Sequence, residues 1–161
     1  MSHKKTLRNC IFQSAAATLA MLGLVFFFYE IVPRPTMVAA LGATASIIFG
    51  MPSSESAQPR RVIGGHAVAV TVASTFSLAL HYMVLPPSWR EIVHSAMVAV
   101  AVGVTMLAMT VTDTTHPPAV GSAFGLVALG PEYRAVLFLL GSAVILSAAR
   151  HILRKHMVDL N

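Results

Sequence analysis

The sequence predicts an all-α integral membrane protein made of two repeats, each a long, a short and a long apolar helix. Three observations support this fold class. Of the 161 residues, 56% are hydrophobic and only 11% are charged, whereas soluble domains carry about 25% charged residues. Four apolar stretches approach or exceed the length of about 20 residues that crosses a bilayer. Two shorter apolar stretches lie between them and resemble each other.

The long stretches cover residues 11–29, 62–85, 92–111 and 134–150, and the short ones cover residues 36–50 and 116–130. A helix of 15 residues rises only about 22 Å, less than the roughly 30 Å of a hydrocarbon core. The short segments are therefore broken or re-entrant helices, or short crossings buried among the longer ones. Pro117 and Pro118 fit the first turn of the second short helix, where a missing N–H group does no harm.

The two halves of the chain align at a fixed offset of 79 residues. Three positions of the first short segment then fall on three of the second: Thr36 on Thr115, Gly42 on Gly121 and Ser46 on Gly125. We expect a single membrane domain over residues 1–161, with repeat one at about 11–85 and repeat two at about 92–155. Three crossings per repeat would invert the second copy relative to the first. Matched short segments in two halves are a sequence indicator of a transport site.

The basic residues lie at the ends of apolar stretches and form no patch, so no nucleic-acid partner is predicted. Six crossings with the N-terminus inside would place eight Lys and Arg residues on the inner side and three on the outer side. If the short segments re-entered the membrane instead, seven Lys and Arg residues would lie on the inner side and four on the outer side. The positive-inside rule thus favours six crossings. It predicts cytoplasmic termini and, for a bacterial protein, the inner membrane.

Both short segments carry a pattern of two small residues four positions apart, Gly42 with Ser46 and Gly121 with Gly125. Such pairs let membrane helices approach closely. The two patches are expected to cross each other at the centre of the molecule. The alternative is that each only packs its helix against an unrelated neighbour, since this spacing is common in membrane helices rich in Ala and Gly.

The residues around the two short-helix starts suggest an anion site. A helix N-terminus carries partial positive charge and free N–H donors. Thr115 and His116 add side-chain donors just before the second start, and Thr36 supplies a hydroxyl at the first. We assign the anion contact to these three residues. The alternative is that the hydroxyls only cap the helix ends.

A further group of residues opens the second long segment. Arg60 or Arg61 is predicted to attract anions to the cytoplasmic mouth or to pair with Glu55. The alternative is that at least one of them only anchors the helix at the inner surface. Gly64 and Gly65 permit close packing one turn into the helix. The adjacent His66 is expected to face protein or a cavity, where it either bonds to a neighbouring helix or contacts the substrate.

Other chemistry finds little support in the sequence. Cys10 is the only cysteine, no nucleotide motif occurs, and no acidic residue lies in the middle of an apolar stretch. We therefore expect no enzyme activity, no cofactor and no metal site. Only His66 and His116 could form an intramembrane proton relay, so the simplest mechanism is a channel or uniporter.

Three short motifs, in this order, carry a family resemblance: Ala57-Gln-Pro-Arg60, Gly64-Gly65-His66 and Thr115-His116-Pro117-Pro118-Ala119. With these motifs the chain resembles the HPP family of small integral membrane proteins. The resemblance implies four spanning helices and a small inorganic anion as substrate. Nitrite is the best guess, because plastid and cyanobacterial members are implicated in nitrite transport. Open alternatives are a non-transporting membrane assembly module and a transporter of another small solute. Because six short helices enclose little volume, we also expect a homo-oligomer.

Overall fold

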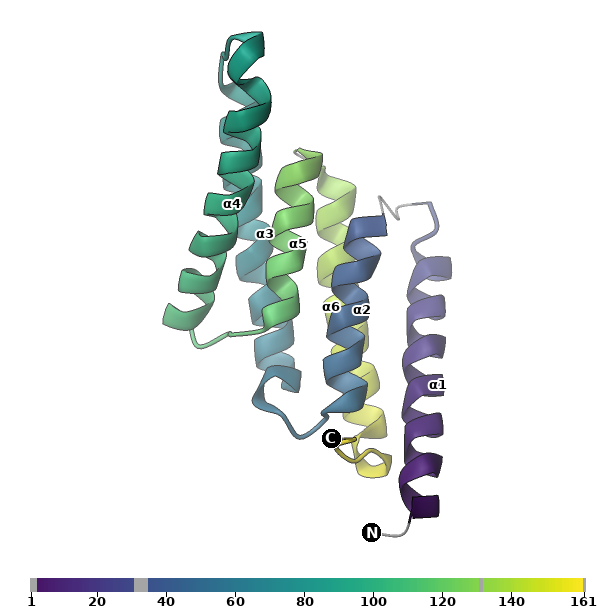
Figure 1. Cartoon of the computed structure of the whole chain (residues 1–161). Helices are drawn as coiled ribbons and strands as arrows, with labels where there is room; N and C mark the ends of the chain where they lie inside the picture. Colours follow the sequence, from purple (N-terminus) through teal and green to yellow (C-terminus); the bar gives the residue numbers. More distant parts are fainter. Residues whose placement is uncertain (1–2, 31–34, 131, 161) are drawn as a thin grey trace.

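Six α-helices make up most of the chain in the computed structural model, which describes residues 3–30, 35–130 and 132–160 (Figure 1). Each predicted apolar segment is confirmed as one helix, with ends that shift by up to eight residues. The helices are α1 (His3–Phe27), α2 (Pro35–Gly50), α3 (Pro59–Tyr82), α4 (Pro87–Val111), α5 (Pro117–Leu129) and α6 (Tyr133–Leu153). Single 3-10 turns, η1 (Glu55–Ala57) and η2 (Arg154–His156), precede α3 and follow α6.

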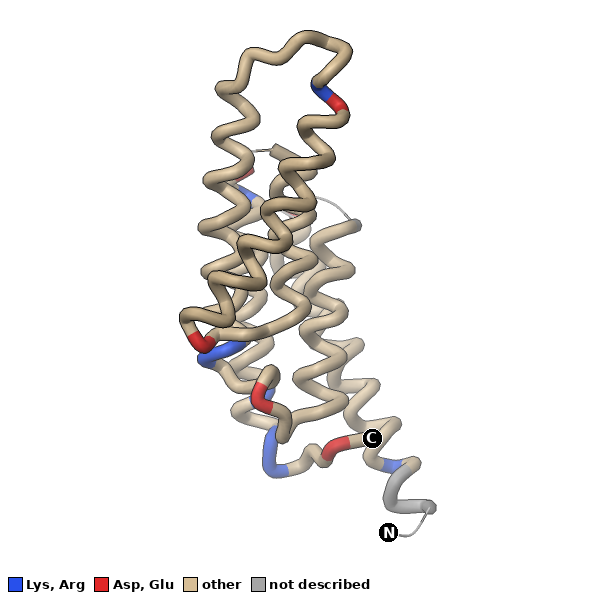
Figure 2. The backbone as a smooth tube through the Cα atoms, turned by 60° about the vertical axis from the view of Figure 1, so that its left-hand side comes forward, with Lys and Arg blue, Asp and Glu red and all other residues tan. Residues whose placement is uncertain are grey.

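Successive helices run in alternating directions, and both chain termini lie at the same end of the bundle (Figure 1). The short helices α2 and α5 therefore pass from one end toward the other, as the six-crossing arrangement requires, and do not turn back. The charged residues gather at helix ends, most of them at the end that holds the termini (Figure 2). This end carries Arg8, Arg60, Arg61, Arg150 and Arg154.

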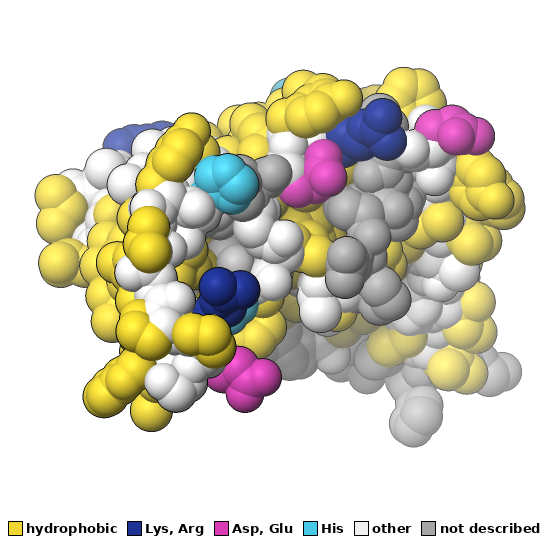
Figure 3. Space-filling model, turned by 90° about the horizontal axis from the view of Figure 1, so that it is seen from above, with side chains coloured by type: hydrophobic (Ala, Val, Ile, Leu, Met, Phe, Trp, Pro, Cys, Tyr) yellow, Lys and Arg dark blue, Asp and Glu magenta, His cyan; other side chains and the backbone are white. Residues whose placement is uncertain are grey.

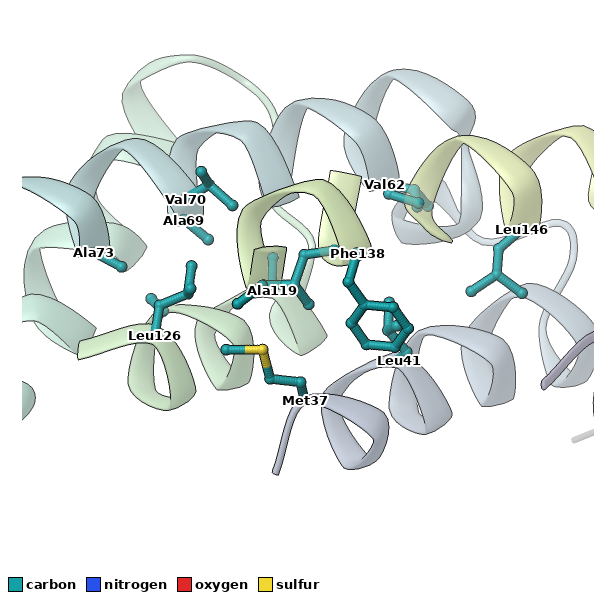
Figure 4. Packing of buried hydrophobic residues seen from close by; sticks show 14 of the residues in the cluster. Met37, Leu41, Val62, Ala69, Val70, Ala73, Ala119, Leu126, Phe138 and Leu146 are labelled. Atoms are coloured by element: carbon teal, nitrogen blue, oxygen red, sulfur yellow. The ribbon is translucent and has the colours of Figure 1, made fainter. Parts of the chain in front are cut away.

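Helix α5 lies at the centre of the bundle and packs against α2, α3 and α4, while α3 also packs against α6. Buried alanines at the α3 and α5 contacts, such as Ala69 and Ala119, let these helices approach closely. Larger side chains fill the space beside them. Met37 of α2 points toward α5, and Phe138 of α6 lies against Leu41 (Figure 4).

Long-range hydrogen bonds close the end of the bundle that holds the termini. Gln13 of α1 is buried and donates to the carbonyl oxygens of Phe49 and, at 2.8 Å, Val158. Its own side-chain oxygen accepts from the N–H of Val158 at 3.1 Å. Asp159 accepts from the N–H of Ser53 at 3.0 Å. The C-terminal segment is thus fixed against α1 and the end of α2.

The outer faces of the bundle are hydrophobic, as a lipid environment requires. Exposed apolar side chains include Leu19 and Phe26 on α1 and Ile92 and Leu107 on α4. Viewed from the end opposite the termini, hydrophobic side chains surround a few charged and His side chains (Figure 3). Four helices in the described part of the chain, α1, α3, α4 and α6, are long and apolar enough to cross a membrane.

Candidate functional site

A cluster of polar side chains lies sealed inside the bundle, where α2, α3 and α5 meet. Thr44 of α2 is its centre, with its Oγ1 atom 3.1 Å from Nε2 of His66 and 3.1 Å from Nε2 of His116. The Nδ1 atom of His66 lies 3.1 Å from Oγ of Ser122. The Nδ1 atom of His116 lies 2.8 Å from the carbonyl oxygen of Ser56. The four side chains have no solvent-exposed surface.

When both rings are neutral, the partners of these atoms assign the positions of the hydrogens. A carbonyl oxygen can only accept, so His116 donates its Nδ1–H to Ser56 and, as a neutral ring, accepts at Nε2. Thr44 supplies that proton and in turn accepts from Nε2–H of His66. The Nδ1 atom of His66 then accepts from the hydroxyl of Ser122. With both rings neutral, every proton of the chain points from Ser122 toward Ser56.

The Gly64-Gly65 pair explains how His116 reaches this position. A Cβ atom on Gly65 would lie 2.8 Å from Cβ of His116 and 2.9 Å from the carbonyl oxygen of Thr114. A Cβ on Gly64 would lie 2.6 Å from Cγ2 of Thr114. The loop before α5 therefore crosses directly over the first turns of α3. The predicted close packing at Gly64 and Gly65 is confirmed, and the segment that packs against them is the loop that carries His116.

The start of α5 does not offer the free amide donors that the sequence analysis expected. Pro117 and Pro118, its first two residues, have no N–H groups. The next amide, of Ala119, donates to the carbonyl oxygen of His116 at 2.9 Å. An anion at this helix start would meet no free amide among these residues. The side chain of His116 points into the buried cluster, while Thr115 is half-buried beside it.

Thr36 lies far from this cluster. Its hydroxyl is 3.7 Å from where a Cβ of Gly125 would stand, nine residues after His116 and hence about 13 Å along α5. Because α2 and α5 are antiparallel, their starts point to opposite ends of the bundle (Figure 1). In this conformation Thr36 and His116 therefore do not lie together, and the anion contact assigned to them stays a prediction.

The small-residue patches meet the expectation only in part. On α5, a Cβ at Gly121 would lie 3.4 Å from Cβ of Ala40, so this stripe does pack against α2. Gly42 has nothing within 4 Å of its Cβ position. With Ser46 it lines a groove of about 530 Å³ between α1 and α2. The two stripes thus do not cross each other, because that of α2 faces α1.

The arginines at the start of α3 form an ion-pair network at the protein surface. Arg61 bonds to Glu55 at 2.9 Å and to Asp113 at 3.0 Å, and Arg60 lies 3.4 Å from Asp113. The predicted pairing with Glu55 is confirmed for Arg61. Asp113 adopts a left-handed backbone conformation, with φ of 52°, as Asp does more readily than most residues. Arg60 thus holds the loop beside the cluster and does not contact it.

Sequence reasoning found His66 and His116 but missed their partners. Thr44 and Ser122 each stand within a short apolar segment, and this placement was the available signal, since polar side chains are costly in a membrane interior. The carbonyl oxygen of Ser56 left no signal in the sequence, because every residue has a backbone acceptor.

The bundle of apolar helices around a sealed polar cluster defines an integral membrane protein. The chain belongs to the HPP transmembrane family, because the family model described as "HPP, transmembrane region" matches residues 2–157. Two proteins of Dictyostelium discoideum, each named only as a transmembrane protein, are similar to it. The first is 34% identical over 99 residues, which are 61% of this chain and 32% of the relative. The second is 32% identical over 112 residues, which are 68% of this chain and 33% of the relative. The chain thus spans about a third of the length of these relatives. No solved structure matches it.

Proposed function

We propose that this protein transports a small inorganic anion across a membrane, with nitrite as the first substrate to test. The observation that carries the proposal is the buried cluster of Thr44, His66, His116 and Ser122. Polar groups inside membrane bundles are costly and mark substrate or ion pathways. The family and the apolar helices support membrane localisation, and the resemblance of the three motifs to the HPP family supports a small anion as the substrate.

In this conformation the cluster is occluded. None of its four side chains is exposed, so an anion reaches it only after the packed helices separate. An open channel would instead show a continuous polar passage. The structure therefore favours a carrier that alternates between closed and open conformations, and the cluster becomes the substrate site when it opens.

We propose that an inverted repeat provides the two units that move relative to each other. The offset of 79 residues relates α1 to α4, α2 to α5 and α3 to α6. Most helix pairs in contact follow the same relation. The contact of α1 with α2 corresponds to that of α4 with α5, α2 with α6 to α5 with α3, and α1 with α6 to α4 with α3, whereas the small contact of α5 with α6 has no counterpart of similar size. The remaining major pairs, α2 with α5 and α3 with α6, map onto themselves. This pattern supports a two-fold axis in the membrane plane, as in many transporters.

The basic end of the bundle is proposed to face the cytoplasm, since most basic residues and both termini lie there. We also propose that the protein acts as a homo-oligomer in the bilayer, because six helices enclose little volume. Neither feature changes the assignment of the site.

One observation favours the competing function, a membrane assembly module. The polar atoms of the cluster satisfy one another, and a purely structural network would do the same. This alternative predicts that a change at His116 alters stability but not flux. A transporter of another solute predicts flux that nitrite does not compete for.

The test is uptake into proteoliposomes at mildly alkaline pH, where neutral nitrous acid contributes little background. The wild type is compared with His116→Ala and with a matched control, His151→Ala, which changes an exposed histidine in the last turn of α6. Monodispersity and helix content confirm equal folding, and Ser122→Ala serves as a milder variant. Saturable uptake that falls in His116→Ala and persists in the control supports the proposal. Wild-type uptake equal to empty liposomes, across a panel of anions, contradicts it.

A further inference from the structure

The hydroxyl of Thr44 has three neighbours and only one hydrogen. Its Oγ1 atom lies 3.1 Å from Nε2 of His66, 3.1 Å from Nε2 of His116 and 3.2 Å from the carbonyl oxygen of Ala40. A hydroxyl donates one hydrogen bond and accepts up to two. Thr44 can therefore serve these neighbours in more than one way without moving any heavy atom.

Two arrangements of hydrogens satisfy the same distances. In the first, Thr44 donates to Nε2 of His116 and accepts from Nε2–H of His66, and both rings are neutral. In the second, Thr44 turns its hydrogen to the carbonyl oxygen of Ala40 and accepts from both Nε2–H groups. The second arrangement contains one more proton than the first, carried on His116, whose Nδ1–H remains bonded to Ser56.

We propose that the cluster takes up one proton together with the anion, so that the protein is a proton-coupled anion carrier and not a uniporter. This inference rests on the proposed function. In the step, the lone pair of His116 Nε2 forms a new N–H bond with the incoming proton. The O–H bond of Thr44 only rotates toward Ala40, and no bond within the protein breaks. The cluster gains one positive charge, which one monovalent anion balances.

The charged groups near the cluster already have partners, so the anion is the group that pairs with the charge on His116. The nearby charged groups, Glu55, Arg60, Arg61 and Asp113, pair with one another at the surface. The described parts of α2 and α5 carry no titratable side chain. On α4, Arg90, Glu91 and His94 lie toward the opposite end of the helix. On α6, Arg150 donates to the carbonyl oxygen of Pro52 at 2.6 Å.

Coupling follows from the cost of buried charge. An isolated charge in an apolar interior is strongly unfavourable unless it is paired. A proton alone and an anion alone would each leave the closed cluster with such a charge. The two together leave none, so each promotes binding of the other, as linkage requires.

The experiment counts protons during anion binding. Nitrite is titrated into the wild type in lipid nanodiscs by calorimetry, in two buffers of different ionisation enthalpy. We expect uptake of about one proton per bound nitrite. Thr44→Val keeps the shape but removes the hydroxyl, and should weaken nitrite binding by about tenfold or more and abolish the proton uptake. Thr44→Ser, which keeps the hydroxyl, should retain both nitrite binding and proton uptake.

The matched control is Thr71→Val, since the exposed Thr71 hydroxyl bonds only within α3, to Ala67 at 2.9 Å. It should behave as the wild type. Nitrite binding and flux without proton uptake would overturn this inference and leave the proposed function standing. Equal proton uptake in Thr44→Val would overturn it as well. Absence of binding and flux for nitrite and other small anions would overturn both. If Thr44→Val does not fold, the number of protons taken up per bound nitrite is compared in the wild type and in Thr44→Ser. About one proton in both supports the inference, and none in the wild type overturns it.

Discussion

Replacing Gly65 with Ala tests whether the first turns of α3 position His116. The new Cβ would lie 2.8 Å from Cβ of His116 and 2.9 Å from the carbonyl oxygen of Thr114. Carbon atoms in favourable contact are about 3.5 Å apart or more, so the loop must retreat by roughly 0.7 Å. Neither neighbour is the end of a flexible side chain, and the shift acts on the hydrogen bond of His116 to Thr44, now 3.1 Å long.

The expected magnitude is best expressed against a control. Gly103→Ala lies in the exposed middle of α4 with nothing within 4 Å of its Cβ position. Both substitutions gain about 1 kcal/mol of helix propensity, so their difference isolates the contact. Overpacking costs about 1–3 kcal/mol, and a lost buried hydrogen bond adds about 1 kcal/mol. We therefore expect Gly65→Ala to be less stable than Gly103→Ala by about 2–4 kcal/mol.

The assay is denaturant unfolding in detergent micelles, followed by helix content, with nitrite uptake measured in parallel. Gly65→Ala should lose both stability and uptake, while Gly103→Ala should lose neither. Equal stability of the two variants would show that the loop before α5 does not pack against Gly65, because the structure leaves no space for the new methyl group.

Three further predictions concern other contacts of the structure. Ser122→Ala removes the donor to Nδ1 of His66 and should cost about 1–3 kcal/mol, which thermal unfolding would detect; an unchanged melting temperature would contradict the assigned hydrogen bond. Gln13→Leu should release the C-terminal segment around Val158, seen as faster protease cleavage there, whereas cleavage at the wild-type rate would show that the segment is held otherwise. Asp113→Asn keeps a residue tolerant of positive φ and removes the charge, so stability should change by less than about 1 kcal/mol; a much larger loss would show that the ion pairs with α3 are worth more than exposed pairs usually are.

The sequence was sufficient to predict the helices, because long apolar stretches bounded by proline and basic residues leave few other structures in a membrane. It also indicated that Gly64 and Gly65 admit a close neighbour. It did not reveal that this neighbour is the loop before α5. Residues 64 and 116 are far apart in the chain, and no periodicity reports which helix faces meet.

The anion contact was assigned to residues that the structure separates, and the reason is physical. Prolines favour a helix start, but the same two residues, Pro117 and Pro118, remove the amide donors on which an anion site at that start depends. The antiparallel course of α2 and α5 then separates Thr36 from His116. His66 and His116, each named as a candidate substrate contact, lie in one polar cluster, and its central residue, Thr44, is visible only once α2 is placed between them.

Nitrogen-15 NMR of histidine-labelled protein, with and without nitrite, tests whether the buried cluster binds the anion and a proton, since ring nitrogens with and without hydrogen have distinct shifts. Single His variants assign the signals of His66 and His116. Without nitrite, we predict a neutral ring protonated at Nε2 for His66 and one protonated at Nδ1 for His116. With saturating nitrite, His116 should become protonated at both nitrogens, while the exposed His151 stays unchanged. Identical tautomers in the two buried rings would contradict the assigned hydrogen positions, and signals that nitrite and other small anions leave unmoved would contradict the assignment of this cluster as the transport site.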